Sequence, residues 1–216
     1  MRSNRKKGRI IAVSVAVVVL LVVLVAVIGT ASEDDAAHGS KVVAVLNGQD
    51  ITAEEVRRMQ ATVLREYGRW ADKEEALEQV IVERLLYWEA ERESYVPTVE
   101  ETEQTMLNLL SRRGLTREAF EEQLGAEALS WQEYLDVYQR HMAISRYLDD
   151  KLDVPEVTEE QARRFYEEYK QRVPEDPRTF EEMEEEIYAG AEWFNRQTAA
   201  FSLIQELRAK AEIHYR

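Results

Sequence analysis

The stretch KVVAVLNGQDIT, from Lys41 to Thr52, decides how the folded part of the chain begins. Its β-branched residues lead into the pair Asn47-Gly48, which is the strongest short signal for a tight hairpin turn. The pattern therefore predicts a strand at 42–46 and a short returning strand at 49–51.

Downstream of this hairpin the sequence predicts a series of helices, and the same pair of residues marks the start of six of them. A Ser, Thr or Asp is followed three residues later by Glu or Gln, the pattern that caps the free N–H groups of a first helical turn. The pairs are Thr52/Glu55, Asp72/Glu75, Thr98/Glu101, Ser130/Glu133, Thr158/Gln161 and Thr179/Glu182. Gly68, Gly114 and Gly125 stand where three helices should end in a left-handed C-cap. The predicted helices cover 53–67, 73–94, 98–113, 116–124, 130–152, 158–172 and 179–209.

The last predicted helix has about 31 residues and a length of roughly 46 Å, too long for one layer of a compact bundle. An apolar stripe follows it at Phe180, Met183, Ile187, Ala191, Phe194 and Phe201. Gly190 indicates close packing, a bend or a tolerated surface position. After this helix, the alternation in Ala211–Tyr215 predicts a short strand. Because a lone strand is not stable, we expect it to pair with the strand near residue 42 and join the ends of the domain.

Upstream of the hairpin, the first 40 residues divide into three segments. A basic tip, 1–9, precedes the uncharged apolar run Ile10–Ile28, and 29–40 has the composition of a flexible spacer. At about 1.5 Å per residue the apolar run spans roughly 28 Å, close to the thickness of a bilayer core. Its length favours an uncleaved transmembrane anchor over a signal peptide cleaved near Gly29, and the basic tip predicts a cytoplasmic N-terminus. The predicted location is the cell membrane, single-pass, with 41–216 as an extracytoplasmic domain; cleavage would instead release a secreted protein.

Composition excludes several classes of function. The 28 Lys and Arg face 42 Asp and Glu, a net charge of −14, so the surface is unsuited to bind nucleic acid. The chain has no cysteine, which rules out thiol catalysis, zinc–thiolate sites and a lipid-modified cysteine. His38, His141 and His214 lack the spacing of metal ligands. We therefore predict no catalytic residues, no metal and no cofactor.

Taken together, the segments of the exported part resemble a known family. They are KVVAVLNGQDIT, ALEQVIVERLLYWEAER (Ala76–Arg92), GLTREAFEEQL (Gly114–Leu124), SWQEYLDVYQRHMAISRYL (Ser130–Leu148), VTEEQARRFYEEYKQR (Val157–Arg172) and FEEMEEEI (Phe180–Ile187). In this order they resemble the SurA N-terminal and PrsA-type exported foldases. The resemblance implies a mainly α fold, a multi-helix peptide-binding domain related to that of trigger factor, with paired terminal strands. Many members carry a parvulin-type isomerase domain between the last two helices, where this chain has only Val173–Arg178, too few residues for a domain.

The resemblance implies an extracytoplasmic, ATP-independent chaperone that binds unfolded or newly exported polypeptides. The membrane anchor is predicted from the apolar run Ile10–Ile28 and not from the family. Two alternatives remain: a peptidyl-prolyl isomerase, which the missing parvulin domain disfavours, and a helical scaffold for one envelope partner, with a homodimer as one form of it. The aromatic residues of the fifth helix are the candidate client-binding residues, with Met142 as an adaptable contact. They are Trp131, Tyr134, Tyr138 and Met142. The competing interpretation is that this helix is central and these side chains are core.

Overall fold

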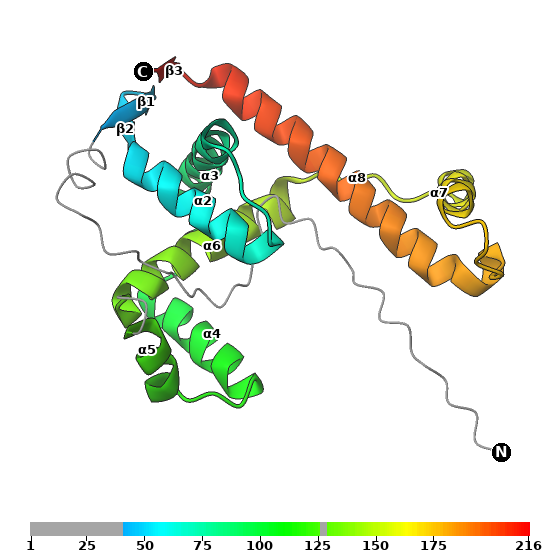
Figure 1. Ribbon diagram of the computed structural model, residues 1–216, viewed down its shortest axis with the longest axis horizontal. Coiled ribbons are helices and arrows are strands. Elements are labelled where there is room, and N and C mark those ends of the chain that lie inside the picture. The colour runs from blue at the N-terminus through cyan, green and yellow to red at the C-terminus, as the bar shows by residue number, and fades with distance from the viewer. Residues whose placement is uncertain (1–40, 126–128) are drawn as a thin grey trace.

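A small antiparallel sheet joins the two ends of the folded chain in the computed structural model, which describes residues 41–125 and 129–216 (Figure 1). β1 (Val42–Leu46) pairs with β2 (Gln49–Thr52) on one side and with β3 (Ile213–Tyr215) on the other. The turn residues Asn47 and Gly48 both have positive φ, 50° and 80°, as a two-residue hairpin requires. The hairpin and its pairing with the C-terminal strand are confirmed.

Within the described residues the rest of the chain is helical. The helices are α2 (Ala53–Tyr67), α3 (Lys73–Arg92), α4 (Val99–Arg112), α5 (Arg117–Gly125), α6 (Trp131–Lys151), α7 (Glu159–Arg172) and α8 (Phe180–Lys210). Their ends agree with the predicted ranges to within two residues. The mainly helical fold class is therefore confirmed.

The predicted caps explain why the helices start where they do. All six N-cap side chains accept a hydrogen bond from the backbone N–H three residues on. At Thr52, Ser130 and Thr179 the glutamate also reaches back to the cap, which completes the capping box. Gly68 and Gly114 are left-handed as predicted, whereas Gly125 is the last residue of α5 and has no positive φ, so its predicted left-handed cap is wrong.

Three separate hydrophobic cores hold the described residues together. The first and largest lies between the sheet, α2, α3, the end of α6 and the end of α8, and includes Leu46, Ile81, Leu86, Ile144 and Ile204. The second joins α4, α5 and the start of α6. The third joins α7 to the start of α8 through Ala162, Phe180, Met183 and Ile187.

α8 is the element that connects the first core to the third. Its second half lies against the first core, and its first half extends away from the body and carries α7 (Figure 1). Its 31 residues therefore pack into two of the three cores, as expected for a helix too long for one layer. At Gly190 an added Cβ would lie 3.1 Å from Cε1 of Phe165, so the predicted close packing at this glycine is confirmed.

The predicted transmembrane segment, 10–28, lies outside the described residues, as do the basic tip and the spacer. Across 41–125 and 129–216, none of the helices combines the length and the apolar character that crossing a membrane needs.

Candidate functional site

The four candidate client-binding residues of α6 lie in the second core or at its edge. Tyr134 and Tyr138 are buried, with 4% and 8% of their surface exposed. Trp131 and Met142 are partly buried against the same core. The structure thus brings all four residues together, but as packing between α4, α5 and α6.

The side chain of Trp131 contacts residues of both α4 and α5. Its Nε1–H donates to Oε1 of Glu103 at 3.2 Å, and the guanidinium of Arg117 lies 4.6 Å from the ring centroid. The ring of Phe120 packs edge-on against Trp131 at 6.3 Å and against Tyr134 at 5.0 Å. Because Trp131 and Met142 keep some exposed surface, client binding at this end of α6 stays a prediction, while Tyr134 and Tyr138 need the core to open.

Exposed aromatic side chains occur instead on α8. Phe194 and Phe201 are 52% and 63% exposed, and Trp193 is 36% exposed. Phe194 and Phe201 are seven residues apart, which puts them on the same side of the helix and about 10 Å apart along its axis. They continue the stripe of Met183 and Ile187 along α8. Phe194 lies at the edge of the part that α7 covers, 6.4 Å from the ring of Phe165, and Phe201 lies beyond it.

The side of α8 around these two rings is uncharged. No Asp, Glu, Lys or Arg occurs between Gln197 and Gln205, in a chain of which 32% is charged. The hydroxyls of Thr198 and Ser202 donate to the carbonyl oxygens of Phe194 and Thr198, both at 3.0 Å, so these side chains use their donors within the helix. We call Phe194, Thr198, Phe201 and Ser202 the α8 aromatic face.

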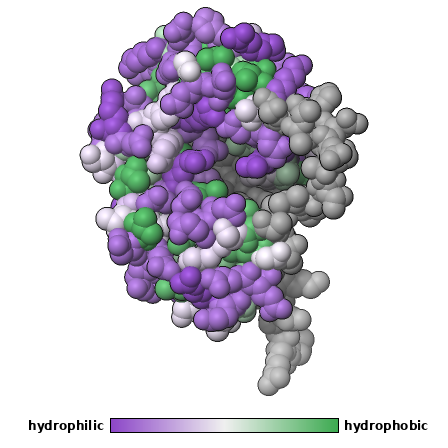
Figure 2. Space-filling view, turned by 90° about the vertical axis from the view of Figure 1, so that its left-hand side faces the viewer, coloured by the Kyte–Doolittle hydropathy of each residue, from purple (hydrophilic) through white to green (hydrophobic). Residues whose placement is uncertain are grey.

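The α8 aromatic face is more apolar than other parts of the surface. The side of the molecule shown in Figure 2 is mostly hydrophilic, with hydrophobic residues in small separate groups. Elsewhere in the described residues, exposed large apolar side chains are scattered along the chain, at Leu64, Trp70, Val99 and Tyr215. An uncharged helix face with two exposed phenylalanines is the kind of surface that marks a protein interaction site.

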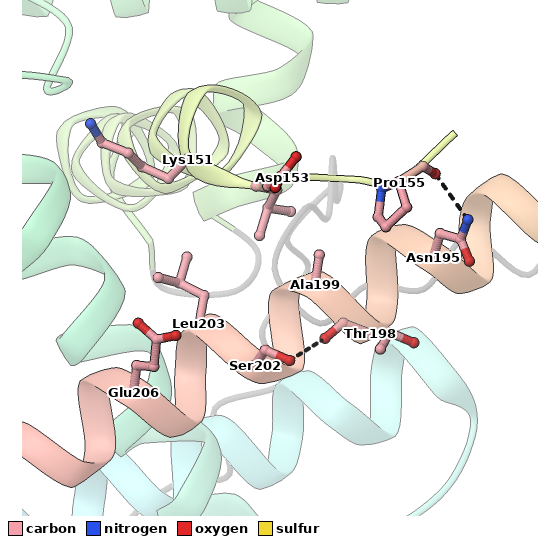
Figure 3. A pocket seen from close by; sticks show the side chains of 10 residues that line it. Lys151, Asp153, Pro155, Asn195, Thr198, Ala199, Ser202, Leu203 and Glu206 are labelled. Carbon is pink, nitrogen blue, oxygen red and sulfur yellow. Dashed lines mark hydrogen bonds between the residues drawn. The ribbon is translucent and has the colours of Figure 1, made fainter. Parts of the chain in front are cut away.

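A groove of about 400 Å³ lies beside the α8 aromatic face, between α8 and the segment that links α6 to α7 (Figure 3). Ala199 and Leu203 project from α8 toward this linker, and Leu152 and Pro155 form the opposite apolar wall. Thr198 and Ser202 belong to both the groove and the α8 aromatic face. The groove and the rings therefore make one continuous surface.

Asn195 fixes the linker against α8. This buried side chain donates from Nδ2 to the carbonyl oxygen of Pro155 at 2.9 Å (Figure 3). Its Oδ1 accepts from Nε2 of Gln161 at 2.6 Å. Because a buried amide is stable only when it is hydrogen-bonded, these contacts hold one end of the groove in place.

The two histidines of the described residues lie on different elements, His141 on α6 and His214 in β3. Among residues 41–125 and 129–216, no three His, Asp or Glu side chains are grouped to hold a metal ion. Burial lowers the pKa of His141, and nearby Glu83 opposes this shift. His214, in the terminal strand, hydrogen-bonds Glu212 at 2.8 Å, and neither residue lines the groove.

The sequence places Phe194 and Phe201 in the apolar stripe of the last helix, and the structure leaves these two residues of the stripe exposed. α7 is 14 residues long and α8 is 31, so α7 cannot cover the whole stripe. The feature of the sequence that marks this exposed part of the helix is the uncharged run Gln197–Gln205, which begins about one turn after Phe194 and contains Phe201.

Comparison with known proteins supports the fold. The profile of the SurA-like N-terminal domain family matches residues 1–148. A solved structure from work on PEB4 and Cj1289, two structurally related SurA-like chaperones of Campylobacter jejuni, superimposes with a TM-score of 0.60. The match covers 81% of this chain and 98% of the other at 13% identity, so it shows a shared fold alone. No curated protein sequence gave a significant match.

Proposed function

Because the chain belongs to the family with a SurA-like N-terminal domain, we propose that it is an ATP-independent chaperone whose α8 aromatic face binds unfolded or newly exported polypeptides. The observation that carries the proposal is the exposure of Phe194 and Phe201 on an uncharged helix face. An unfolded client exposes apolar side chains, and burying them against two rings and a neighbouring groove is favourable without any nucleotide.

We also propose where the protein is located. The uncharged run Ile10–Ile28, with basic residues before it, supports a single membrane anchor that leaves residues 41–216 on the extracytoplasmic side. A chaperone tethered there would meet polypeptides as they emerge from export. Protease accessibility of the C-terminal domain in intact cells and in spheroplasts tests this orientation.

Prolyl isomerisation is not part of the proposal. α7 ends at Arg172 and α8 begins at Phe180, so the position at which related proteins carry a parvulin domain holds a short connection. We expect no acceleration of a proline-limited refolding reaction by this chain.

Suppression of client aggregation tests the proposal. The full chain in phosphatidylcholine nanodiscs is mixed with lysozyme that aggregates on reduction, and light scattering is followed; the reductant cannot alter a chain that lacks cysteine. We expect scattering to fall as the chain approaches and exceeds equimolar amounts. The double substitution Phe194→Ser/Phe201→Ser should remove most of this effect, because it removes both rings without changing charge.

A matched control separates the α8 aromatic face from apolar surface in general. Trp70, in the connection between α2 and α3, and Val99, at the start of α4, are exposed to a similar degree, 62% and 51%. The variant Trp70→Ser/Val99→Ser should suppress aggregation like the wild type. Absence of suppression at several-fold excess, or equal losses in both variants, would contradict the proposal. Cross-linking that captures one stoichiometric partner instead of many clients would favour the scaffold function.

A further inference from the structure

The charges of the groove beside the α8 aromatic face are not balanced. Asp153 on the linker and Glu206 on α8 both line it, and neither forms an ion pair with another described residue. The groove has one cationic side chain, Lys151. Two exposed carboxylates thus stand beside an uncharged aromatic face.

Lys151 does not neutralise these carboxylates, because other residues already hold it. Its Nζ lies 2.6 Å from Oε2 of Glu93 and 3.4 Å from Oδ2 of Asp150, neither of which lines the groove. Its ammonium group points away from Ala199 and Leu203 in Figure 3. Of the cations of α8 near the groove, Arg196 pairs with Asp149, and Lys210, one turn from Glu206, does not line the groove. The groove is therefore left with a net negative charge.

Resting on the function proposed above, we infer that the groove selects client segments in which a lysine or arginine lies close to aromatic or aliphatic residues. The apolar side chains contact the α8 aromatic face, and the cation is attracted to Asp153 and Glu206. An extended client rises about 3.3 Å per residue, so the roughly 10 Å from Phe194 to Phe201 corresponds to three client residues. The occupant is thus a short, basic and apolar segment of an unfolded polypeptide.

Three labelled peptides test this inference by fluorescence anisotropy with the full chain in phosphatidylcholine nanodiscs. Each has ten residues with two phenylalanines three positions apart, and the residue beside the second is lysine, glutamine or glutamate. We expect the lysine peptide to bind about two- to fivefold more tightly than the glutamine peptide, the range for an exposed ion pair. The glutamate peptide should bind most weakly, and added salt should reduce the differences.

A pair of charge variants separates the groove from the overall charge of −14. Asp153→Asn/Glu206→Gln should abolish the preference for lysine over glutamine and leave binding of the glutamine peptide unchanged. Glu100→Gln/Glu122→Gln removes the same charge from exposed sites on α4 and α5 and should keep the preference. Equal loss of preference in both variants would show a long-range charge effect and overturn the inference.

The peptides also distinguish the two proposals. If the glutamine and lysine peptides bind the wild type equally and Phe194→Ser/Phe201→Ser weakens both, the proposed function stands and the charge selection is overturned. If none of the three peptides binds, both proposals fail.

Discussion

At residue 190 a glycine lets α7 lie directly against α8. The Cβ of any other residue would come within 3.1 Å of the ring of Phe165, which also packs 6.4 Å from the ring of Phe194. Glycine costs about 1 kcal/mol of helix propensity relative to alanine, so its place inside a long helix indicates that the close approach matters.

Substitution of Gly190 by leucine should loosen this contact. Alanine is a weak test, because its higher helix propensity would offset the cost of its contact with Phe165, and a small shift of that ring would relieve the contact. Leucine is therefore the sharper test. We expect Gly190→Leu to lower the free energy of unfolding by about 1–3 kcal/mol, because the added side chain occupies the space of the Phe165 ring. Urea denaturation of residues 41–216, followed by circular dichroism, measures the change.

The neighbouring Ala189 provides the control, since it is exposed and Ala189→Leu adds the same kind of side chain on the same helix. That variant should unfold like the wild type. A double-mutant cycle with Phe165→Ala should show coupling between the two positions. Equal effects of Gly190→Leu and Ala189→Leu would count against tight packing at this site.

At the scale of elements, one carboxylate makes several of the hydrogen bonds that hold the connection between α7 and α8. Asp176 accepts hydrogen bonds from the hydroxyl of Tyr169 at 2.6 Å, the guanidinium of Arg178 at 2.8 Å and the backbone N–H of Arg178 at 3.0 Å. Arg178 also pairs with Glu186 on α8 at 3.0 Å. The hydrogen bonds from Arg178, followed by that from Tyr169, hold the pKa of Asp176 well below its ordinary value.

The depressed pKa of Asp176 predicts how the stability of this connection depends on pH. A carboxylate with a lower pKa in the folded state stabilises the fold above its unfolded pKa of about 3.9, and this contribution is lost as the pH falls toward the folded pKa. We therefore expect Asp176→Asn to lower the melting temperature at pH 7 by an amount that stays constant down to about pH 5. The difference from the wild type should shrink below about pH 4. Thermal melts followed by circular dichroism at several pH values measure it.

Glu175→Gln is the matched control, because Glu175 is an exposed neighbour in the same connection. It should melt like the wild type at every pH. A difference between Asp176→Asn and the wild type that persists undiminished at pH 2 would show that the carboxylate charge is not the cause.

Helix starts were predictable from sequence because each depends on residues three positions apart. Thr179 caps α8 whatever packs on that helix, and the turn at Asn47 is equally local. Burial is different, since it depends on which elements meet. Tyr138 is core because α4 and α5 cover α6. Phe201 is exposed because α7 begins beside Asn195 and runs back toward the start of α8, so it does not reach Phe201. Neither fact follows from periodicity alone.

On the scale of the whole molecule, the three cores differ greatly in size. Among the described residues, 18 buried side chains form the first core and 4 form the third. α8 belongs to both, with Met183 and Ile187 in the small core and Ile204 and Leu207 in the large one. Local opening requires less free energy where fewer apolar contacts are lost, so the two halves of this one helix should differ in stability.

Hydrogen exchange followed by mass spectrometry tests this difference along α8. We expect amides in 180–191 to exchange about tenfold or more faster than those in 200–207, together with the amides of α7, because the third core opens without the first. Gly190→Leu should speed exchange in the first half of α8 and leave the second half unchanged. Uniform protection from exchange along α8 would mean that both cores open as one unit. The α8 aromatic face between them would then lie on a uniformly stable helix. Uneven protection would place that face where a stable body meets a more mobile arm, so that α7 and the start of α8 can adjust to clients of different size.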